Sequence, residues 1–272
     1  MLEERIIHEG MLLLYGLTSI FYFIDFLYHN QKANRIAFWL LAMVWITQTV
    51  FLLIEITANG SVPIQTLNDG LYTYTWIIIT FSLLVHLFLR QEFFMFFISV
   101  FGFFVMIIHT LQSIQLVDSA QIPAMLNEML FAHIVLALVS YGSFTISFIF
   151  ACLYFMQYYL LKQKKGYKWL KRFQDLEGLE KRAFQLIVLA EPLLLLSIIL
   201  GVVWAYMTGT EFYWGDSKTI GSIFVFAIYA IYLLMRIRRG YRGKSILTWN
   251  IFSFLMLLIN FFLFNSLSNF HM

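Results

Sequence analysis

The residues in this chain best suited to cofactor chemistry are its six histidines, His8, His29, His86, His109, His133 and His271. An imidazole inside lipid is costly unless it faces a partner, a cavity or a metal. Haem iron takes axial nitrogen ligands from such side chains. Each histidine could equally be an ordinary polar group at the membrane interface.

The composition identifies an integral membrane protein, because 61% of the 272 residues are apolar and only 12% are charged. A soluble domain carries about 25% charged residues. The apolar residues form runs near the roughly 20 residues that span a bilayer, and lipid permits only helices there or closed barrels, whose alternation these runs lack. We therefore predict an all-α polytopic bundle forming a single transmembrane domain over residues 1–272. Its eight spans are predicted at residues 11–28, 36–57, 71–89, 93–110, 131–160, 184–207, 219–236 and 245–266.

Basic residues predict the orientation of these spans, since Lys and Arg are retained on the cytoplasmic side. The connections after spans one, three, five and seven carry all of the Lys and Arg except Arg5 and Lys218. Both termini and the loop 211–218 are therefore predicted to face outward. This topology puts four histidines at the outer edge, at the depth of Trp76, Trp204 and Trp214, and the set could wall a flat aromatic cofactor. These four are His8, His109, His133 and His271.

The connection 161–183 is the sizeable cytoplasmic segment in this topology. Trp169, Phe173 and Leu176 recur at helical spacing, so one face of the segment is apolar and the other is basic. Such a pattern is typical of a helix that lies on the membrane surface or offers a site to a partner. The alternative is a basic anchor without a partner.

One acid in the predicted spans stands beside a helix-distorting residue. Glu191 is followed by Pro192, which should kink the sixth span. An acid at a kink could belong to a proton or substrate path. It could also be protonated and bonded to a neighbouring helix.

Five stretches, in order, resemble segments of a known family. Residues 201–243, GVVWAYMTGTEFYWGDSKTIGSIFVFAIYAIYLLMRIRRGYRG, are similar to the WWD segment of the CcsA/CcmC/ResC cytochrome c assembly family. The other four are GSVPIQTLNDGLYTYTW, LFAHIVLALVSYGSFTISFIFACLYF, LEKRAFQLI and NFFLFNSLSNFHM. The family-like region runs from about residue 60 to 272.

The resemblance implies an outward-facing haem site. The family's two outer histidines, which are the axial ligands of the haem iron, match His133 and His271. Its aromatic loop matches residues that would bind the porphyrin and its propionates: Trp204, Trp214, Asp216 and Lys218.

Departures from the family pattern point to one branch of it. Gly209, Tyr213 and Gly215 stand where family tryptophans usually do, and Ser61 replaces a family histidine. The thinned loop and the eight spans resemble the HemX branch, which the family resemblance associates with bacterial haem-biosynthesis genes.

The HemX resemblance implies a protein of the bacterial plasma membrane that is a negative effector of glutamyl-tRNA reductase and not an enzyme. The expected partners are lipid, haem and a cytosolic partner at 161–183, either the reductase itself or a regulatory protein, with no nucleic acid. The sequence has no HExxH, CxxC or Gly-rich phosphate loop that would indicate catalysis. Two alternatives remain open: a haem-delivery or cytochrome c synthetase component, and a scaffold without a cofactor.

Overall fold

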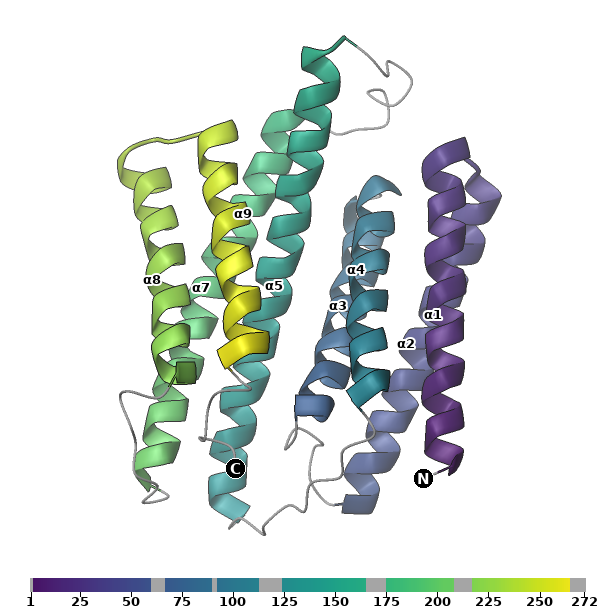
Figure 1. The fold of residues 1–272 in the computed structure, drawn as a ribbon, viewed down its shortest axis with the longest axis vertical. Helices are drawn as coiled ribbons and strands as arrows, with labels where there is room; N and C mark the ends of the chain where they lie inside the picture. Colours follow the sequence, from purple (N-terminus) through teal and green to yellow (C-terminus); the bar gives the residue numbers. More distant parts are fainter. Residues whose placement is uncertain are drawn as a thin grey trace. The chain divides into compact units, whose positions relative to one another are not determined.

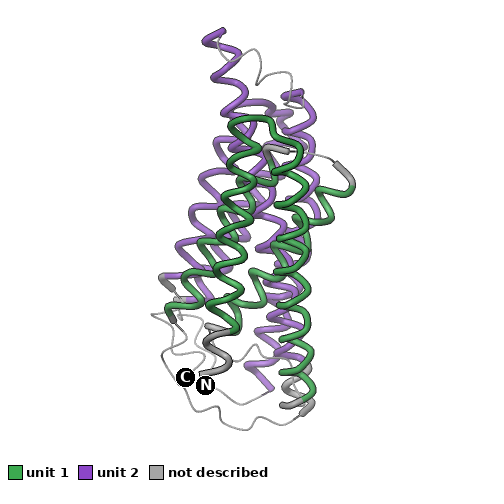
Figure 2. Tube along the Cα trace, turned by 90° about the vertical axis from the view of Figure 1, so that its right-hand side faces the viewer, with its two compact units in different colours: residues 1–121 green, residues 122–272 purple. Residues whose placement is uncertain are grey.

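The computed structural model describes residues 2–59, 67–89, 92–112, 124–164, 175–207 and 217–264. All regular structure within these residues is helical, and eight of the helices are long and apolar enough to cross a membrane. The predicted all-α bundle of about eight spans is thereby confirmed. The chain forms two compact units, residues 1–121 and 122–272, with four of these helices each (Figures 1 and 2).

The first unit is a ring of four helices in which α1 and α3 each pack against both α2 and α4. Two indole N–H groups join α2 to α3. Trp45 donates to Thr80 over 2.8 Å, and Trp76 donates to Thr49 over 2.9 Å. The helices are α1 (Leu2–Tyr28), α2 (Gln31–Asn59), α3 (Leu67–Leu89) and α4 (Glu92–Gln112).

The turn between α1 and α2 is two residues long, and each residue has a separate role. His29 adopts φ 53°, the left-handed conformation that commonly ends a helix. Asn30 caps α2, because its Oδ1 accepts hydrogen bonds from the backbone N–H groups of Lys32 and Ala33. This tight turn sets α1 and α2 side by side.

The second unit is also a ring, in which α5 and α8 each pack against both α7 and α9. Two hydrogen bonds show that α5 and α7 run antiparallel: the Ser147 hydroxyl donates to Ala183, and the His133 ring bonds to Ser197. The elements are α5 (Ala124–Lys162), α7 (Leu176–Met207), α8 (Ser217–Arg238), α9 (Lys244–Ile259) and a π-helical turn η1 (Asn260–Phe264).

The interface of α5 and α7 repeats every seven residues on both helices. Ser197 Oγ donates to the carbonyl of His133 over 2.8 Å. Ser140 Oγ donates to the carbonyl of Ala190 over 2.9 Å, and Ser147 Oγ donates to that of Ala183 over 2.8 Å. We call these three hydrogen bonds the serine ladder. A seven-residue period is the geometry of left-handed helix packing, and small residues at the interface let two helices approach closely.

The opposite end of the second unit from His133 is closed by an ion pair. Glu180 on α7 pairs with Arg236 near the end of α8. Its Oε2 also accepts the backbone N–H of Gly243 over 2.8 Å, and Arg236 lies over the ring of Phe184. One carboxylate thus joins α7, α8 and the turn before α9.

Helices α5 and α7 both extend beyond the apolar runs from which they were predicted. Helix α5 has 39 residues, and at about 1.5 Å per residue it is nearly twice as long as the roughly 30 Å of hydrocarbon in a bilayer. Helix α7 starts at Leu176, eight residues before the predicted span, because Asp175 Oδ2 accepts the N–H of Gly178 and caps the helix. The segment 161–183 therefore includes the end of α5 and the start of α7. Trp169 and Phe173 lie outside the described residues, so the amphipathic helix stays a prediction.

The serine ladder predicts that bulk at a small ladder position is destabilising. Ala190 is fully buried, and Ala190→Leu should lower the free energy of unfolding by about 1–3 kcal/mol because it forces α5 away from α7. The measurement is thermal unfolding of the purified protein in detergent. Leu189→Ala is the matched control, since Leu189 is 52% exposed and should change stability little. Equal melting temperatures for the two variants would contradict the ladder.

Candidate functional site

His133 is held by α7 through one of its two ring nitrogens. Its Nδ1 lies 2.6 Å from the carbonyl oxygen of Ser197 and 3.2 Å from the Ser197 hydroxyl. A carbonyl oxygen only accepts hydrogen bonds, so Nδ1 carries the proton and donates it. The lone pair of the neutral ring is then on Nε2, for which the described residues provide no hydrogen-bond partner. Neutral imidazole with its other nitrogen fixed by a carbonyl is the form that ligates metals.

Gly201 makes room for the His133 ring. A Cβ built on Gly201 would lie 2.7 Å from Cε1, 2.8 Å from Nδ1 and 3.3 Å from Nε2 of that ring. Real side chains do not pack at such distances, so only glycine fits here. Glycine inside a helix destabilises it by roughly 1 kcal/mol relative to alanine, and the close approach of the ring accounts for its presence.

Two further predicted site residues lie at the same end of the second unit. Trp204 is 6% exposed and follows Ser197 and Gly201 on one face of α7, at steps of four and three residues. Lys218 is the second residue of α8 and is close enough to His133 to act on it electrostatically. The structure thus places one imidazole, one indole and one ammonium group of the predicted set at the same end of the unit.

The other half of the predicted set is outside the part of the chain that the structure describes. This applies to Trp214, Asp216 and His271, so the His133–His271 ligand pair stays a prediction. The described chain does show how η1, the helical turn that precedes the C-terminal residues, is held. Asn260 Nδ2 lies 3.3 Å from Ser222 Oγ and 3.5 Å from Tyr141 Oη. These contacts hold η1 against α5 and α8 at the same end of the unit as His133.

In the first unit, two of the other outer histidines meet. The rings of His8 on α1 and His109 on α4 have centroids 5.0 Å apart and lie edge to face. Tyr72 packs against both rings, at 5.5 Å from His8 and 5.2 Å from His109. Rings in direct contact leave no space for a porphyrin between them. His8 and His109 are therefore a poor alternative to His133 and His271 as axial ligands.

The remaining histidines have local structural roles. His86 on α3 stacks on Phe38 of α2 with a centroid distance of 4.7 Å, and His29 forms the α1–α2 turn. Trp76 donates its N–H to Thr49 in the packing of α2 on α3. Among the described residues, no three His, Cys, Asp or Glu side chains converge as a metal site.

Glu191 is buried, with Pro192 following it inside α7. Neither carboxylate oxygen has a hydrogen-bond partner within the described ranges. The structure therefore provides no support there for the bond to a neighbouring helix that the sequence allowed. The carbonyl of the preceding residue, Ala190, accepts the Ser140 hydroxyl of the serine ladder instead.

The two residues that hold the His133 ring, Ser197 and Gly201, were not among the candidates from sequence. Their signal is a set of small residues on one face of α7 that continues to Trp204. In an almost wholly apolar helix such a signal is weak, because small residues also occur by chance. Only the position of the histidine ring gives them a function.

Comparisons with known proteins identify the family of this chain. The model of the family "Cytochrome C assembly protein" matches residues 64–271. The chain belongs to this family of membrane proteins. No solved structure matches it.

Two proteins named HemX are similar to this chain over nearly their full length. Protein HemX of Bacillus subtilis (strain 168) is 44% identical over 265 residues, which cover 97% of this chain and 96% of that protein. Protein HemX of Brevibacillus brevis is 37% identical over 271 residues, with 100% and 99% coverage. Cytochrome c biogenesis protein CcsA of Chlamydomonas reinhardtii is 27% identical over 128 residues, 47% of this chain and 35% of that protein. The resemblance to the HemX branch is confirmed.

The contact between Gly201 and His133 generates a stability prediction. Gly201→Ala should lower the free energy of unfolding by about 1–3 kcal/mol, because the new methyl group displaces a ring that Ser197 holds in place. Thermal unfolding in detergent measures the change. Gly10→Ala is the control: a Cβ at Gly10 in α1 meets nothing within 4 Å, so that variant should be unchanged or more stable. A Gly201→Ala protein as stable as Gly10→Ala would contradict the inferred ring position.

Proposed function

We propose that this protein is a HemX-type membrane regulator that lowers the amount of glutamyl-tRNA reductase and binds haem at an outward-facing site. The proposal takes the role in haem biosynthesis from the family resemblance. The haem-binding part rests on the geometry of His133. The protein acts as a regulator and does not itself catalyse a reaction.

The observation that carries the haem site is the tautomer of His133. With Nδ1 donating to the Ser197 carbonyl, Nε2 has its lone pair available to a metal. One ring nitrogen is fixed and the other has no hydrogen-bond partner among the described residues, which is the arrangement that a metal ligand requires. This argument supports His133 as an axial ligand.

The neighbouring residues fit the rest of a haem. Bound haem supplies an iron with two axial positions, which two imidazoles can fill, and two anionic propionates. His133 and His271 would take the axial positions. Trp204 and Trp214 would pack on the porphyrin, and Lys218 carries the charge that suits a propionate. Asp216 would complete the loop beside them.

The proposed topology has both termini and the haem site outside a bacterial plasma membrane. It follows from basic residues, which are concentrated at the other end of the helices. In this topology the segment 161–183 faces the cytosol and would contact glutamyl-tRNA reductase or a regulatory partner. Lipid surrounds the remaining faces.

Regulation by haem requires that haem bind two states of the bundle with different affinity. Helix α7 is the element suited to link the sites, since Ser197 holds the haem ligand near one end and Leu176 adjoins the basic segment at the other. The serine ladder makes α5 and α7 move as a pair. A change at His133 would therefore be transmitted along both helices.

Removal of both proposed ligands should abolish the haem spectrum. The double variant His133→Ala, His271→Ala should contain at least about tenfold less haem per protein than the wild type, because both axial bonds are lost. The measurement is the Soret absorbance of protein purified in detergent after addition of haem. His29→Ala is the matched control, because His29 is exposed in the α1–α2 turn and should leave the spectrum unchanged. Full haem content in the double variant would overturn the site.

Deletion of the gene separates the proposed regulator from the alternative. A negative effector predicts that glutamyl-tRNA reductase accumulates, by about severalfold, while c-type cytochromes remain. Quantitative immunoblots and haem-stained gels measure the two in the same cells. Loss of c-type cytochromes with unchanged reductase would favour the alternative, a haem-delivery or cytochrome c synthetase component. No change in either would reject both.

A further inference from the structure

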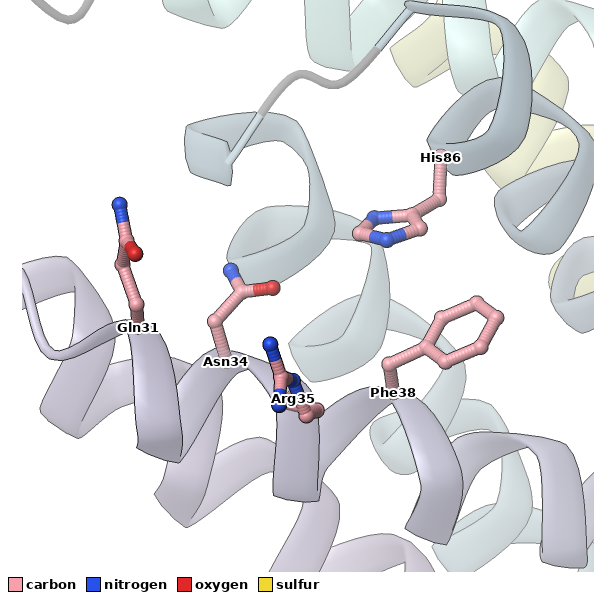
Figure 3. A pocket seen from close by; sticks show the side chains of 5 residues that line it. All are labelled: Gln31, Asn34, Arg35, Phe38 and His86. Carbon is pink, nitrogen blue, oxygen red and sulfur yellow. The ribbon is translucent and has the colours of Figure 1, made fainter.

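A small cavity opens between α2 and α3 in the first unit. It has a volume of about 270 Å³ and is lined by Gln31, Asn34, Arg35, Phe38 and His86. Figure 3 shows four of these side chains rising from one helix, with the His86 ring above Phe38 from another. We call this cavity the α2–α3 pocket. The site proposed for haem uses none of its residues.

The pocket offers hydrogen-bond donors and one permanent positive charge. The guanidinium of Arg35 is a planar fork that matches phosphate oxygens, and the Gln31 amide can donate beside it. The Asn34 amide has a second N–H besides the one that it donates to Asp25. The stacked Phe38 holds the His86 ring in place at a centroid distance of 4.7 Å. This combination is suited to an oxyanion.

Two groups near the pocket could compete with a ligand for its donors. Asp25 is an acid close by, but it is 1% exposed and its Oδ2 accepts the Asn34 amide over 2.8 Å. The first backbone N–H groups of α2 are already engaged, because Asn30 Oδ1 accepts from Lys32 and Ala33. A ligand in the pocket would therefore be held by side chains, and the N-terminal backbone of α2 would contribute little to its binding.

The size of the pocket limits what it can hold. Pockets for drug-sized ligands measure about 300–1,000 Å³, and a tetrapyrrole would need space at the upper end of that range. A cavity of about 270 Å³ accepts a phosphate with a small substituent. This argues against a second haem and for a lipid head group or a free phosphate.

The surroundings favour the lipid. Beside the pocket residues, α2 exposes an apolar stripe on which acyl chains can lie: Ile36 is 45%, Trp39 60% and Met43 52% exposed. The pocket also lies at the end of the unit where Lys32 and Arg35 are exposed. Basic pockets between membrane helices bind anionic head groups, because the positive charges of the protein attract the negatively charged lipid.

We propose that the α2–α3 pocket binds the phosphate of an anionic phospholipid, with Arg35 as its principal ligand and the acyl chains along Ile36, Trp39 and Met43. The bound lipid would fill the gap between the start of α2 and the end of α3. This binding is independent of haem and of the regulation proposed above.

The test measures lipid binding to the full-length protein in detergent by native mass spectrometry. Dioleoylphosphatidylglycerol should bind more tightly than dioleoylphosphatidylcholine, because the anionic head group makes a charge-assisted contact. Arg35→Gln should weaken binding of the anionic lipid about tenfold, to the level of the neutral lipid. Lys32→Gln is the matched control, since it removes the same charge from the same helix outside the pocket, and it should weaken binding less than about twofold.

A second variant and a second probe complete the test. Gln31→Leu removes a pocket amide without changing the charge, and it should also weaken binding of the anionic lipid. Equal effects of Arg35→Gln and Lys32→Gln, or none, would overturn the pocket as a specific site. Inorganic phosphate that bound with the same dependence on Arg35, while the two lipids bound equally, would overturn the lipid in favour of a soluble anion.

Discussion

The antiparallel contact of α5 with α7 is the constraint on which the second unit depends. In lipid, two helices gain little from hiding apolar surface, so close packing and hydrogen bonds must hold them together. The serine ladder supplies both: small residues let the backbones approach, and each hydroxyl bonds to a carbonyl of the other helix. Asn250 of α9 joins the ladder at Ser147, with its Nδ2 2.9 Å from Ser147 Oγ. Helix α9 is thereby fixed to the same register.

The ladder also explains why His133 is so well defined. His133 occupies the end position of the seven-residue repeat, where the partner residue Ser197 supplies two contacts. Its hydroxyl bonds to the His133 carbonyl, and its own carbonyl accepts the ring N–H. Gly201, one turn further along α7, leaves the space that the ring fills. The interactions that hold the helices together therefore also orient the proposed ligand.

The number and type of helices could be predicted from sequence because the length of an apolar run is a direct physical requirement of the bilayer. The helix ends could not, since they depend on polar contacts outside the runs. Helix α7 starts early because Asp175 caps it and because the nearby Glu180 pairs with Arg236, a residue 56 positions away in the chain. For the site, the histidine was identifiable from its family resemblance. The residues that orient it were not, because Ser197 and Gly201 are unremarkable until the ring position is known.

The two proposed axial ligands belong to different parts of the chain, and this bears on the proposed regulation. His133 belongs to the serine ladder, and its ring contacts Ser197 and Gly201. His271 follows η1, which the described chain ties to α5 and α8 through Asn260. On the proposed function, haem would connect the serine ladder to the C-terminal end of the chain. Bound haem would therefore stabilise the state of the bundle in which His133 and His271 lie close together.

A synthetase must present haem to another protein and release it, whereas a regulator needs only a difference in haem affinity between two states. A thinned aromatic loop with a histidine bonded to α7 meets the second requirement more readily than the first.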